Sequence, residues 1–231
     1  MTDFLEEIRY IIFDLNGTLA NEDYLNPDVV LEDCLKCQRK GRQMTGQDLQ
    51  KVAKGIIPLS ELIAKIYTVN NPENISNQYF KIQSSRISFR ENALEVLKVL
   101  YKKYILILCS DTTGIAKDVV SNLDISRYFD KILYSCDLGF LKSEKIFWLN
   151  LLKQFPKSRP QEFLVIGDNP PADILNPNLL NMTTIKIENP IKLTLDYRQT
   201  STNSDNEIPN YYIKKLVEIL PLLNLKFNSL I

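Results

Sequence analysis

The stretch IIFDLNGTLA, residues 11–20, carries the main signal for the fold. Its apolar residues run up to Phe13 and stop at Asp14, and Asn16-Gly17 has the composition of a turn. A short, continuously apolar run is typical of a strand that is buried on both faces of a parallel sheet. We therefore expect Asp14 at the carboxyl end of a buried strand, immediately before a turn.

Further apolar runs of this kind follow along the chain. The strand candidates lie at residues 10–13, 105–109, 132–134, 163–166 and 184–187. Between them, apolar residues recur at helical spacing in residues 92–101, 115–123 and 143–155. Strands and helices that alternate in this way predict an α/β fold with a doubly wound parallel sheet.

One long interval, from Gly17 to about residue 90, shows no strand pattern. Its helical patterns lie at residues 31–35, 49–57 and 59–69. About seventy residues are too many for a plain loop inside a compact domain, so we expect a small helical cap domain inserted after the first strand. The predicted domains are an α/β core at residues 1–17 and 90–231 and the helical cap at residues 18–89.

The end of the chain combines a polar segment with an amphipathic pattern. Residues 196–210 are polar and are expected to form an exposed connection. Residues 211–220 carry apolar side chains at helical spacing, which predicts a final helix that stops at Pro221.

Composition and charge exclude several classes of function. With 28 basic and 28 acidic residues the chain has no net charge, so we expect neither a nucleic-acid partner nor an anionic membrane surface. The first ten residues lack the basic and apolar pattern of a secretory signal, and no apolar run reaches the roughly 20 residues of a membrane span, so we expect a cytoplasmic protein. The absence of histidine excludes histidine general bases and histidine-containing zinc sites.

Polar side chains follow several of the predicted strands at the point where each strand ends. They are Asp14, Ser110 with Asp111, Lys142 just before a helix, and Asp168 with Asp173. Each of them alone could be a turn residue, a helix cap or a solvated charge. Because ligands bind beyond the carboxyl ends of the strands in an open parallel sheet, their coincidence at one edge favours a functional site.

Together these motifs resemble the four motifs of the haloacid dehalogenase (HAD) superfamily. The matching residues are Asp14-Leu15-Asn16-Gly17-Thr18-Leu19, Ser110, Lys142 in KSEKIFW, and Gly167-Asp168 with Asp173. They occur in the family's order within residues 8 to about 190, and the helical interval looks like the family's type 1 cap. Ser143 stands where the family usually has proline.

The resemblance implies a hydrolase with a covalent intermediate on Asp14, most often an aspartyl phosphate. It implies a Mg²⁺ cofactor held by the carboxylates of Asp14 and Asp168, by the backbone carbonyl of Asn16, and by Asp173 in the first or second metal shell. The implied partner is a small phosphorylated substrate. The oligomeric state stays open.

The resemblance also implies which side chains contact the substrate. Lys142 would offset the charge on the phosphoryl group and on the nucleophile, and Ser110 would hydrogen-bond a phosphoryl oxygen. Asp111, beside Ser110, is a further candidate for substrate binding. The sequence leaves open which residues of the cap face the site.

Asn16 departs from the pattern of the family's phosphatases, which have a second aspartate as acid and base at this position. An amide cannot deliver a proton, and loss of a positioned acid or base typically lowers the rate by about 10²- to 10⁴-fold. We therefore expect slow hydrolysis of ordinary alkyl phosphates. Acyl phosphates, anhydrides and activated aryl phosphates, whose leaving groups depart without protonation, would suffer less.

Three alternatives remain at this stage. A dehalogenase needs no acid, because halide leaves unaided, but the family's dehalogenases typically lack the glycine-aspartate motif that this chain retains at Gly167-Asp168. A catalytically degenerate member would bind a phosphorylated ligand or a partner without turnover. Asn16-Gly17 is also prone to deamidation, and conversion of Asn16 to aspartate would restore the usual pattern.

Overall fold

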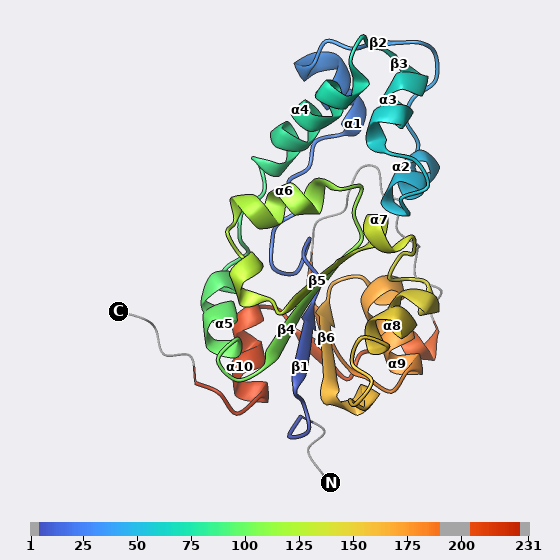
Figure 1. The fold of residues 1–231 in the computed structure, drawn as a ribbon. Helices are drawn as coiled ribbons and strands as arrows, with labels where there is room; N and C mark the ends of the chain where they lie inside the picture. The colour runs from blue at the N-terminus through green and yellow to red at the C-terminus, as the bar shows by residue number, and fades with distance from the viewer. Residues whose placement is uncertain (1–4, 190–203, 227–231) are drawn as a thin grey trace.

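A computed structural model describes residues 5–189 and 204–226 of the chain. Its main sheet has six strands in the order β5-β4-β1-β6-β7-β8, and all neighbouring strands pair in parallel (Figure 1). The strands are β1 (Tyr10–Phe13), β4 (Ile105–Ser110), β5 (Lys131–Tyr134), β6 (Phe163–Gly167), β7 (Thr183–Ile187) and β8 (Tyr211–Ile213). The predicted α/β fold with a doubly wound parallel sheet is confirmed.

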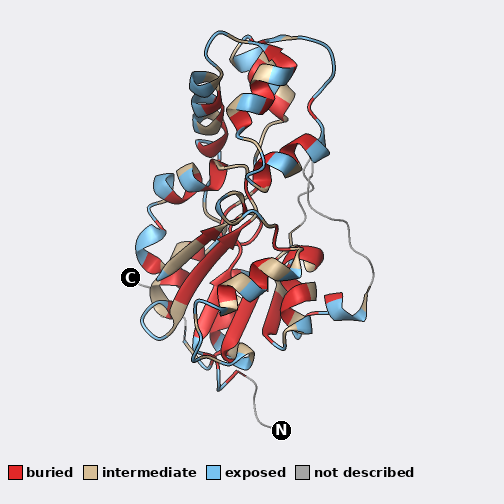
Figure 2. Ribbon diagram, turned by 45° about the vertical axis from the view of Figure 1, so that its right-hand side comes forward, coloured by how far each residue is buried: buried red, intermediate tan, exposed pale blue. Residues whose placement is uncertain are grey.

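Helices cover both faces of this sheet, as the apolar run of β1 requires. Ile11 and Phe13 pack in one apolar cluster with α5, α6 and α10, whereas Tyr10 and Ile12 pack on the opposite face with α8. The helices of the α/β part are α5 (Ala93–Leu100), α6 (Ile115–Asn122), α7 (Ser135–Leu138), α8 (Lys145–Leu152), α9 (Leu175–Leu179) and α10 (Ile219–Leu222). Successive strand residues point to opposite faces, so β1 is buried along its whole length (Figure 2).

The helices between β1 and α5 surround an apolar core of their own. The elements are α1 (Pro27–Val29), a π-helical turn η1 (Val30–Cys34), β2 (Gln38–Arg39), α2 (Gly46–Ala53), α3 (Leu59–Ile66), β3 (Tyr67–Thr68) and α4 (Pro72–Ser84). Leu31, Leu62 and Ile63 are fully or almost fully buried in this core. The short antiparallel pair β2–β3 adds two strands that the sequence pattern did not predict. We call α1 to α4 the helical insertion; its predicted limits at residues 18 and 89 stay a prediction.

The two chain segments that connect the helical insertion to the sheet lie side by side. Ala20 and Phe89 form an antiparallel bridge. Beside it, the backbone N–H of Asn21 donates to the carbonyl of Ser88 over 3.0 Å, and Asn21 Nδ2 donates to Ser88 Oγ over 2.9 Å. The insertion therefore begins and ends at neighbouring points, and it lies beyond the carboxyl ends of the strands (Figure 1).

The predicted helix at residues 211–220 is wrong in its first half. The chain forms β8 at Tyr211–Ile213, then a 3-10 turn η6 at Leu216–Glu218, and α10 only from Ile219. The edge of β7 offers backbone donors and acceptors, and residues 211–213 satisfy them by parallel pairing. Pro221 lies inside the short α10, in its first turn, where proline is tolerated.

Two other expectations concern the last part of the chain and membranes. Of the polar segment 196–210, residues 196–203 lie outside the described residues, and residues 204–210 contain the short 3-10 turn η5 (Asp205–Glu207). Within residues 5–189 and 204–226, no helix is both long enough and apolar enough to cross a membrane.

Candidate active site

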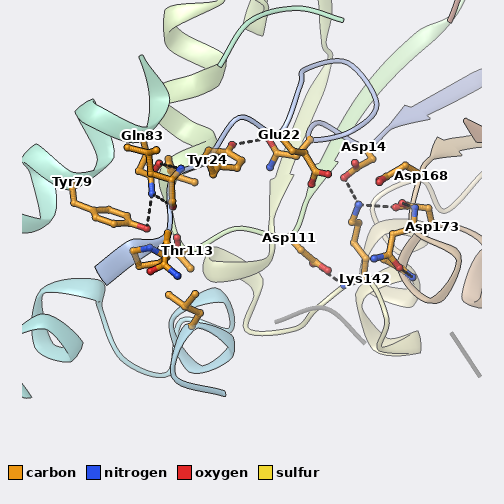
Figure 3. A pocket seen from close by; sticks show the side chains of 18 residues that line it. Asp14, Glu22, Tyr24, Tyr79, Gln83, Asp111, Thr113, Lys142, Asp168 and Asp173 are labelled. Atoms are coloured by element: carbon orange, nitrogen blue, oxygen red, sulfur yellow. Dashed lines mark hydrogen bonds and ion pairs between the residues drawn. The ribbon is translucent and has the colours of Figure 1, made fainter. Parts of the chain in front are cut away.

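Four predicted site residues meet beyond the carboxyl ends of the central strands. Lys142 Nζ contacts Asp14 Oδ1 and lies 2.6 Å from Asp173 Oδ1, and all three side chains are buried (Figure 3). Carboxylate oxygens of Asp14, Asp168 and Asp173 lie within 4.8 Å of one another. The structure thus brings one lysine and three carboxylates into a single cluster, in which Asp168 is half-buried and the other three side chains are buried. We call it the carboxylate cluster.

The turn after β1 places Asp14 against Asp168. The backbone N–H of Asp14 still donates to Ile166 of β6 over 2.9 Å, so Asp14 lies where the strand ends. Gly17 follows with a φ of 78°, in the left-handed region that favours glycine. A Cβ at this position would lie 2.7 Å from Asp168 Oδ2, so only glycine leaves room for that carboxylate.

The loop after β6 holds Asp173 in a similar way. Its Oδ2 accepts a hydrogen bond from the backbone N–H of Asn169 over 3.0 Å, which leaves Oδ1 for Lys142. A Cβ on Gly167 would lie 2.2 Å from Asp173 Cγ. The glycine of the Gly167-Asp168 motif therefore makes space for a side chain six residues later in the same loop.

The backbone around Lys142 is held by three side chains. Trp148 Nε1 donates to the carbonyl of Lys142 over 2.7 Å, and Asn176 Nδ2 donates to the carbonyl of Ser143 over 2.8 Å. The carboxylate of Asp111 accepts from the backbone N–H of Lys142 over 2.9 Å. Asp111, predicted as a substrate contact, thus helps to position Lys142.

Removing the indole N–H of Trp148 is expected to loosen this support. The Trp148→Phe variant would leave the carbonyl of Lys142 with only the longer hydrogen bond from Asn176 Nδ2, over 3.4 Å. We expect the variant to unfold at a lower urea concentration, with a loss of about 1–3 kcal/mol in the free energy of unfolding. The free energy of unfolding is measured by urea titration monitored with circular dichroism. Tyr101→Phe is the control, because Tyr101 is 46% exposed and should change stability by less than about 0.5 kcal/mol. Equal losses in the two variants would contradict a specific role for Trp148.

Burial and charge shape the protonation of the cluster. Burial raises the pKa of Asp14 well above its ordinary value; Lys142 opposes this shift, while Asp173 and Asp168 add to it. Burial alone lowers the pKa of Lys142, but the carboxylates of Asp14 and Asp173 raise it well above its ordinary value. Lys142 is therefore an ammonium ion that contacts two carboxyl groups.

The donor set of the carboxylate cluster suits a hard divalent cation. Mg²⁺ binds oxygen ligands and commonly uses one or two carboxylates together with water and a substrate phosphate. Asp14, Asp168 and Asp173 supply such oxygens within a single small volume. Without a cation their mutual repulsion would favour protonation of at least one of them, so the residues present fit a metal.

Comparison with known families identifies the relatives of this site. Residues 11–187 match the family described as haloacid dehalogenase-like hydrolase. The chain belongs to this family of hydrolases. No curated protein matches the HAD-like chain closely enough in sequence to count as a relative.

Several solved structures share the fold of this HAD-like hydrolase. The 2-haloacid dehalogenase of Pseudomonas syringae pv. tomato DC3000 is 18% identical with a TM-score of 0.65, and the match covers 94% of this chain and 98% of that one. The magnesium-bound YfnB of Bacillus subtilis is 18% identical with a TM-score of 0.64, covering 94% and 99%. The HAD family enzyme bt-2542 of Bacteroides thetaiotaomicron, in complex with magnesium and inorganic phosphate, is 18% identical with a TM-score of 0.61, covering 81% and 98%.

A pocket of about 100 Å³ in this HAD-like hydrolase opens over the carboxylate cluster. The predicted site residues Asp14, Asn16, Asp111, Lys142, Asp168 and Asp173 all line it. The amide oxygen of Asn16 accepts a hydrogen bond from the hydroxyl of Tyr24 over 2.7 Å. Burial is the main cause that raises the pKa of Tyr24 above its ordinary value, so Tyr24 is a neutral donor to Asn16.

Ser110 is the predicted site residue that the structure does not bring to the pocket. Its side chain is 1% exposed, its Oγ lies 3.5 Å from the carbonyl of Asp111, and it is absent from the described lining. Thr113, two residues beyond Asp111, lines the pocket instead. Contact between Ser110 and a phosphoryl oxygen stays a prediction.

Sequence reasoning missed the residues that support the HAD-like site from neighbouring segments. Asn189 Nδ2 donates to Asp168 Oδ2 over 2.8 Å and to Glu22 Oε2 over 2.7 Å, so one amide links two carboxylates. Gln83 pairs with the backbone N–H and carbonyl of Leu25 over 2.9 and 2.8 Å. Asn189, Glu22 and Gln83 belong to no motif. Glu22 and Gln83 line the pocket, and Asn189 is connected to it through Asp168 and Glu22, which only the folded chain shows.

Proposed function

We propose that this HAD-like hydrolase is a Mg²⁺-dependent phosphatase that acts on a small phosphorylated metabolite through an aspartyl phosphate on Asp14. The observation that carries the proposal is the buried contact of Lys142 with both Asp14 and Asp173, with Asp168 beside them. A carboxylate that attacks a phosphoryl anion needs positive charge fixed around it in advance. A lysine and three metal-competent carboxylates in one cluster support this chemistry.

The residues of the chain would take part in the reaction as follows. A carboxylate oxygen of Asp14 attacks phosphorus, the bond from phosphorus to the leaving oxygen breaks, and the electron pair departs with the leaving group. Lys142 holds the nucleophile and offsets its charge. Water then attacks phosphorus, the bond to Asp14 breaks, and the proton that water loses ends on the product phosphate or in solvent.

The oxygens of Asp14, Asp168 and Asp173 and the backbone carbonyl of Asn16 would hold Mg²⁺. When bound, this ion supplies the charge that offsets repulsion between the phosphoryl group and the carboxylates. In bt-2542, whose fold is similar, magnesium and inorganic phosphate are bound together.

Asn16 would limit the rate for substrates that need a proton donor. Its amide oxygen accepts from Tyr24, so the groups it offers to a leaving oxygen are N–H donors, which stabilise negative charge without transferring a proton. The favoured substrates are therefore phosphate esters and anhydrides whose leaving groups depart as stable anions.

Removal of Mg²⁺ is expected to stop turnover. Phosphate release from acetyl phosphate and p-nitrophenyl phosphate should fall by about 10²-fold or more with EDTA, because the cluster then repels the substrate. Colorimetric phosphate assays with and without added Mg²⁺ measure this, and calorimetric titration of Mg²⁺ measures binding directly. Asp168→Asn should weaken Mg²⁺ binding, whereas Asp137→Asn, on an exposed surface pair, should not. Turnover that is equal with EDTA and with Mg²⁺ would contradict the proposal.

These assays also distinguish the phosphatase from a dehalogenase and from a protein that binds its ligand without turnover. Dehalogenation requires no metal, so the metal-competent cluster favours phosphoryl transfer over it. A binding-only protein would take up Mg²⁺ and release no phosphate from any ester or anhydride. Release of halide from a 2-haloacid without Mg²⁺ would support the dehalogenase instead.

A further inference from the structure

The pocket over the carboxylate cluster has two chemically different walls. The wall next to Asp14 is charged, as described above. The opposite wall comes mainly from the helical insertion, from the chain just before it and from the start of α6. Its apolar members are Leu25, Pro27, Leu49, Tyr79 and Ile115. Figure 3 shows Tyr24, Tyr79 and Gln83 on this side, facing the cluster across the pocket. A phosphoryl group at Asp14 would therefore point its leaving group at an apolar surface.

The charges around the pocket are almost all negative. Among the described lining residues the acidic ones are Asp14, Glu22, Asp111, Asp168 and Asp173. Lys142 is the one cation in the described lining, and Asp14 and Asp173 already bind it. Two nearby cations lie outside the lining: Arg90 donates to the carbonyls of Gly17 and Glu188, and Lys54 pairs with Glu144.

The described residues of these walls offer no unpaired cation to a second anionic group on the substrate. A carboxylate or second phosphate on the leaving group would be moved from water to an apolar wall, without a free counter-ion among the described lining residues. The polar lining groups on this side are neutral, namely Tyr24, Asn26, Tyr79, Gln83 and Thr113. Gln83 is already engaged with the backbone of Leu25 and with Tyr79. The leaving group that fits is uncharged and flat or apolar.

We propose that the substrates are aryl monophosphates, with an uncharged aromatic leaving group seated between Leu49, Ile115 and Tyr79; this inference rests on the phosphatase function proposed above. Two independent features favour the same class. The apolar wall, which has no cation among its described residues, accommodates the ring, and a phenolate departs without the proton that Asn16 cannot deliver. The bond from Asp14 to phosphorus forms as the aryl oxygen leaves with its electron pair, and the phenolate then takes its proton from solvent.

A matched pair of substrates tests this inference. 4-Carbamoylphenyl phosphate and 4-carboxyphenyl phosphate have the same shape and differ by one negative charge on the leaving group. We expect kcat/KM with Mg²⁺ to be about 10-fold or more higher for the carbamoyl compound, which corresponds to about 1.4 kcal/mol. Equal values for the two compounds, with clear phosphate release from both, would overturn the inference and leave the phosphatase function standing.

A single variant should reverse the preference. Thr113 lines the pocket and is partly exposed, so Thr113→Lys can place a cation near the leaving group at little cost to folding. We expect it to raise kcat/KM for 4-carboxyphenyl phosphate about 10-fold relative to the carbamoyl compound. Thr113→Gln, similar in length but neutral, is the control and should keep the original preference.

The two proposals fail in different ways. No phosphate from either aryl ester or from acetyl phosphate, with folded protein that binds Mg²⁺, overturns the phosphatase function and the aryl proposal with it. Release from acetyl phosphate but from neither aryl ester overturns the aryl proposal alone. If Thr113→Lys does not fold, as judged by circular dichroism, the comparison of the two substrates on the unmodified protein still decides.

Discussion

Replacing Asp14 by asparagine is expected to abolish phosphate release, with a loss on the order of 10⁴-fold or more. The amide is a poor nucleophile, so no aspartyl phosphate can form, even though Lys142 and Asp173 remain in contact. Phosphate assays with acetyl phosphate and an aryl phosphate measure the loss. Mass spectrometry of rapidly quenched protein should show a phosphate adduct on the protein that carries Asp14 and none on the Asp14→Asn variant.

The stability of this variant separates chemistry from folding. Burial already disfavours the charged form of Asp14, so a neutral side chain of the same shape should leave the melting temperature unchanged or raise it. Asp137→Asn makes the same chemical change at an exposed position and should keep full activity. An Asp14→Asn protein that melts normally and still turns over would show that Asp14 is not the nucleophile.

The second large effect is a gain of activity in Asn16→Asp. A carboxylic acid at this position can protonate the leaving oxygen, and we expect kcat for alkyl phosphates to rise by about 10²- to 10⁴-fold. Tyr24 already donates to the side-chain oxygen of Asn16 and would hold an aspartate in the same place. The rate should be measured over a series of esters graded by the acidity of the leaving alcohol, and the gain should grow as that acidity falls.

The control for this gain is Asn16→Leu, which removes the amide and adds no acid. It should lower the rate for all esters, because the N–H donors of Asn16 are lost. If Asn16→Asp gives no gain with alkyl phosphates while Mg²⁺ binding is intact, proton donation is not the limiting step, and the proposed account of Asn16 is wrong.

The sequence predicted the sheet and most of the cluster because both depend on local patterns. A four-residue apolar run predicts a strand with two buried faces, and the parallel order of such strands fixes where Asp14 and Asp168 must meet. Lys142 and Asp173 followed from the order and type of the motifs in the resemblance. The structure adds the contacts of Lys142 with Asp14 and Asp173.

The rest of the site depends on contacts between distant segments. The helical pattern at residues 49–57 predicts a buried face in α2, and no helical pattern was identified for α4. Neither the pattern nor its absence shows that Leu49 and Tyr79 line the same pocket as Asp14. The strand at Tyr211–Ile213 likewise depends on the free edge of β7, which no local pattern reveals. Ser110 was chosen because it follows the apolar run 105–109, and it is the last residue of β4. Its contact with a phosphoryl oxygen stays a prediction, whereas Thr113, which the sequence did not single out, lines the pocket.

The adjacent ends of the helical insertion bear on how such a protein can change over evolutionary time. Because Ala20 and Phe89 are bridged and Asn21 is bonded to Ser88, the sheet receives the same local geometry whatever the intervening chain contains. Exchanging the segment for another, or shortening it, alters the wall that meets the leaving group but not the groups that act on phosphorus. New substrates can thus be acquired by modular replacement, with the reactive half of the pocket inherited intact.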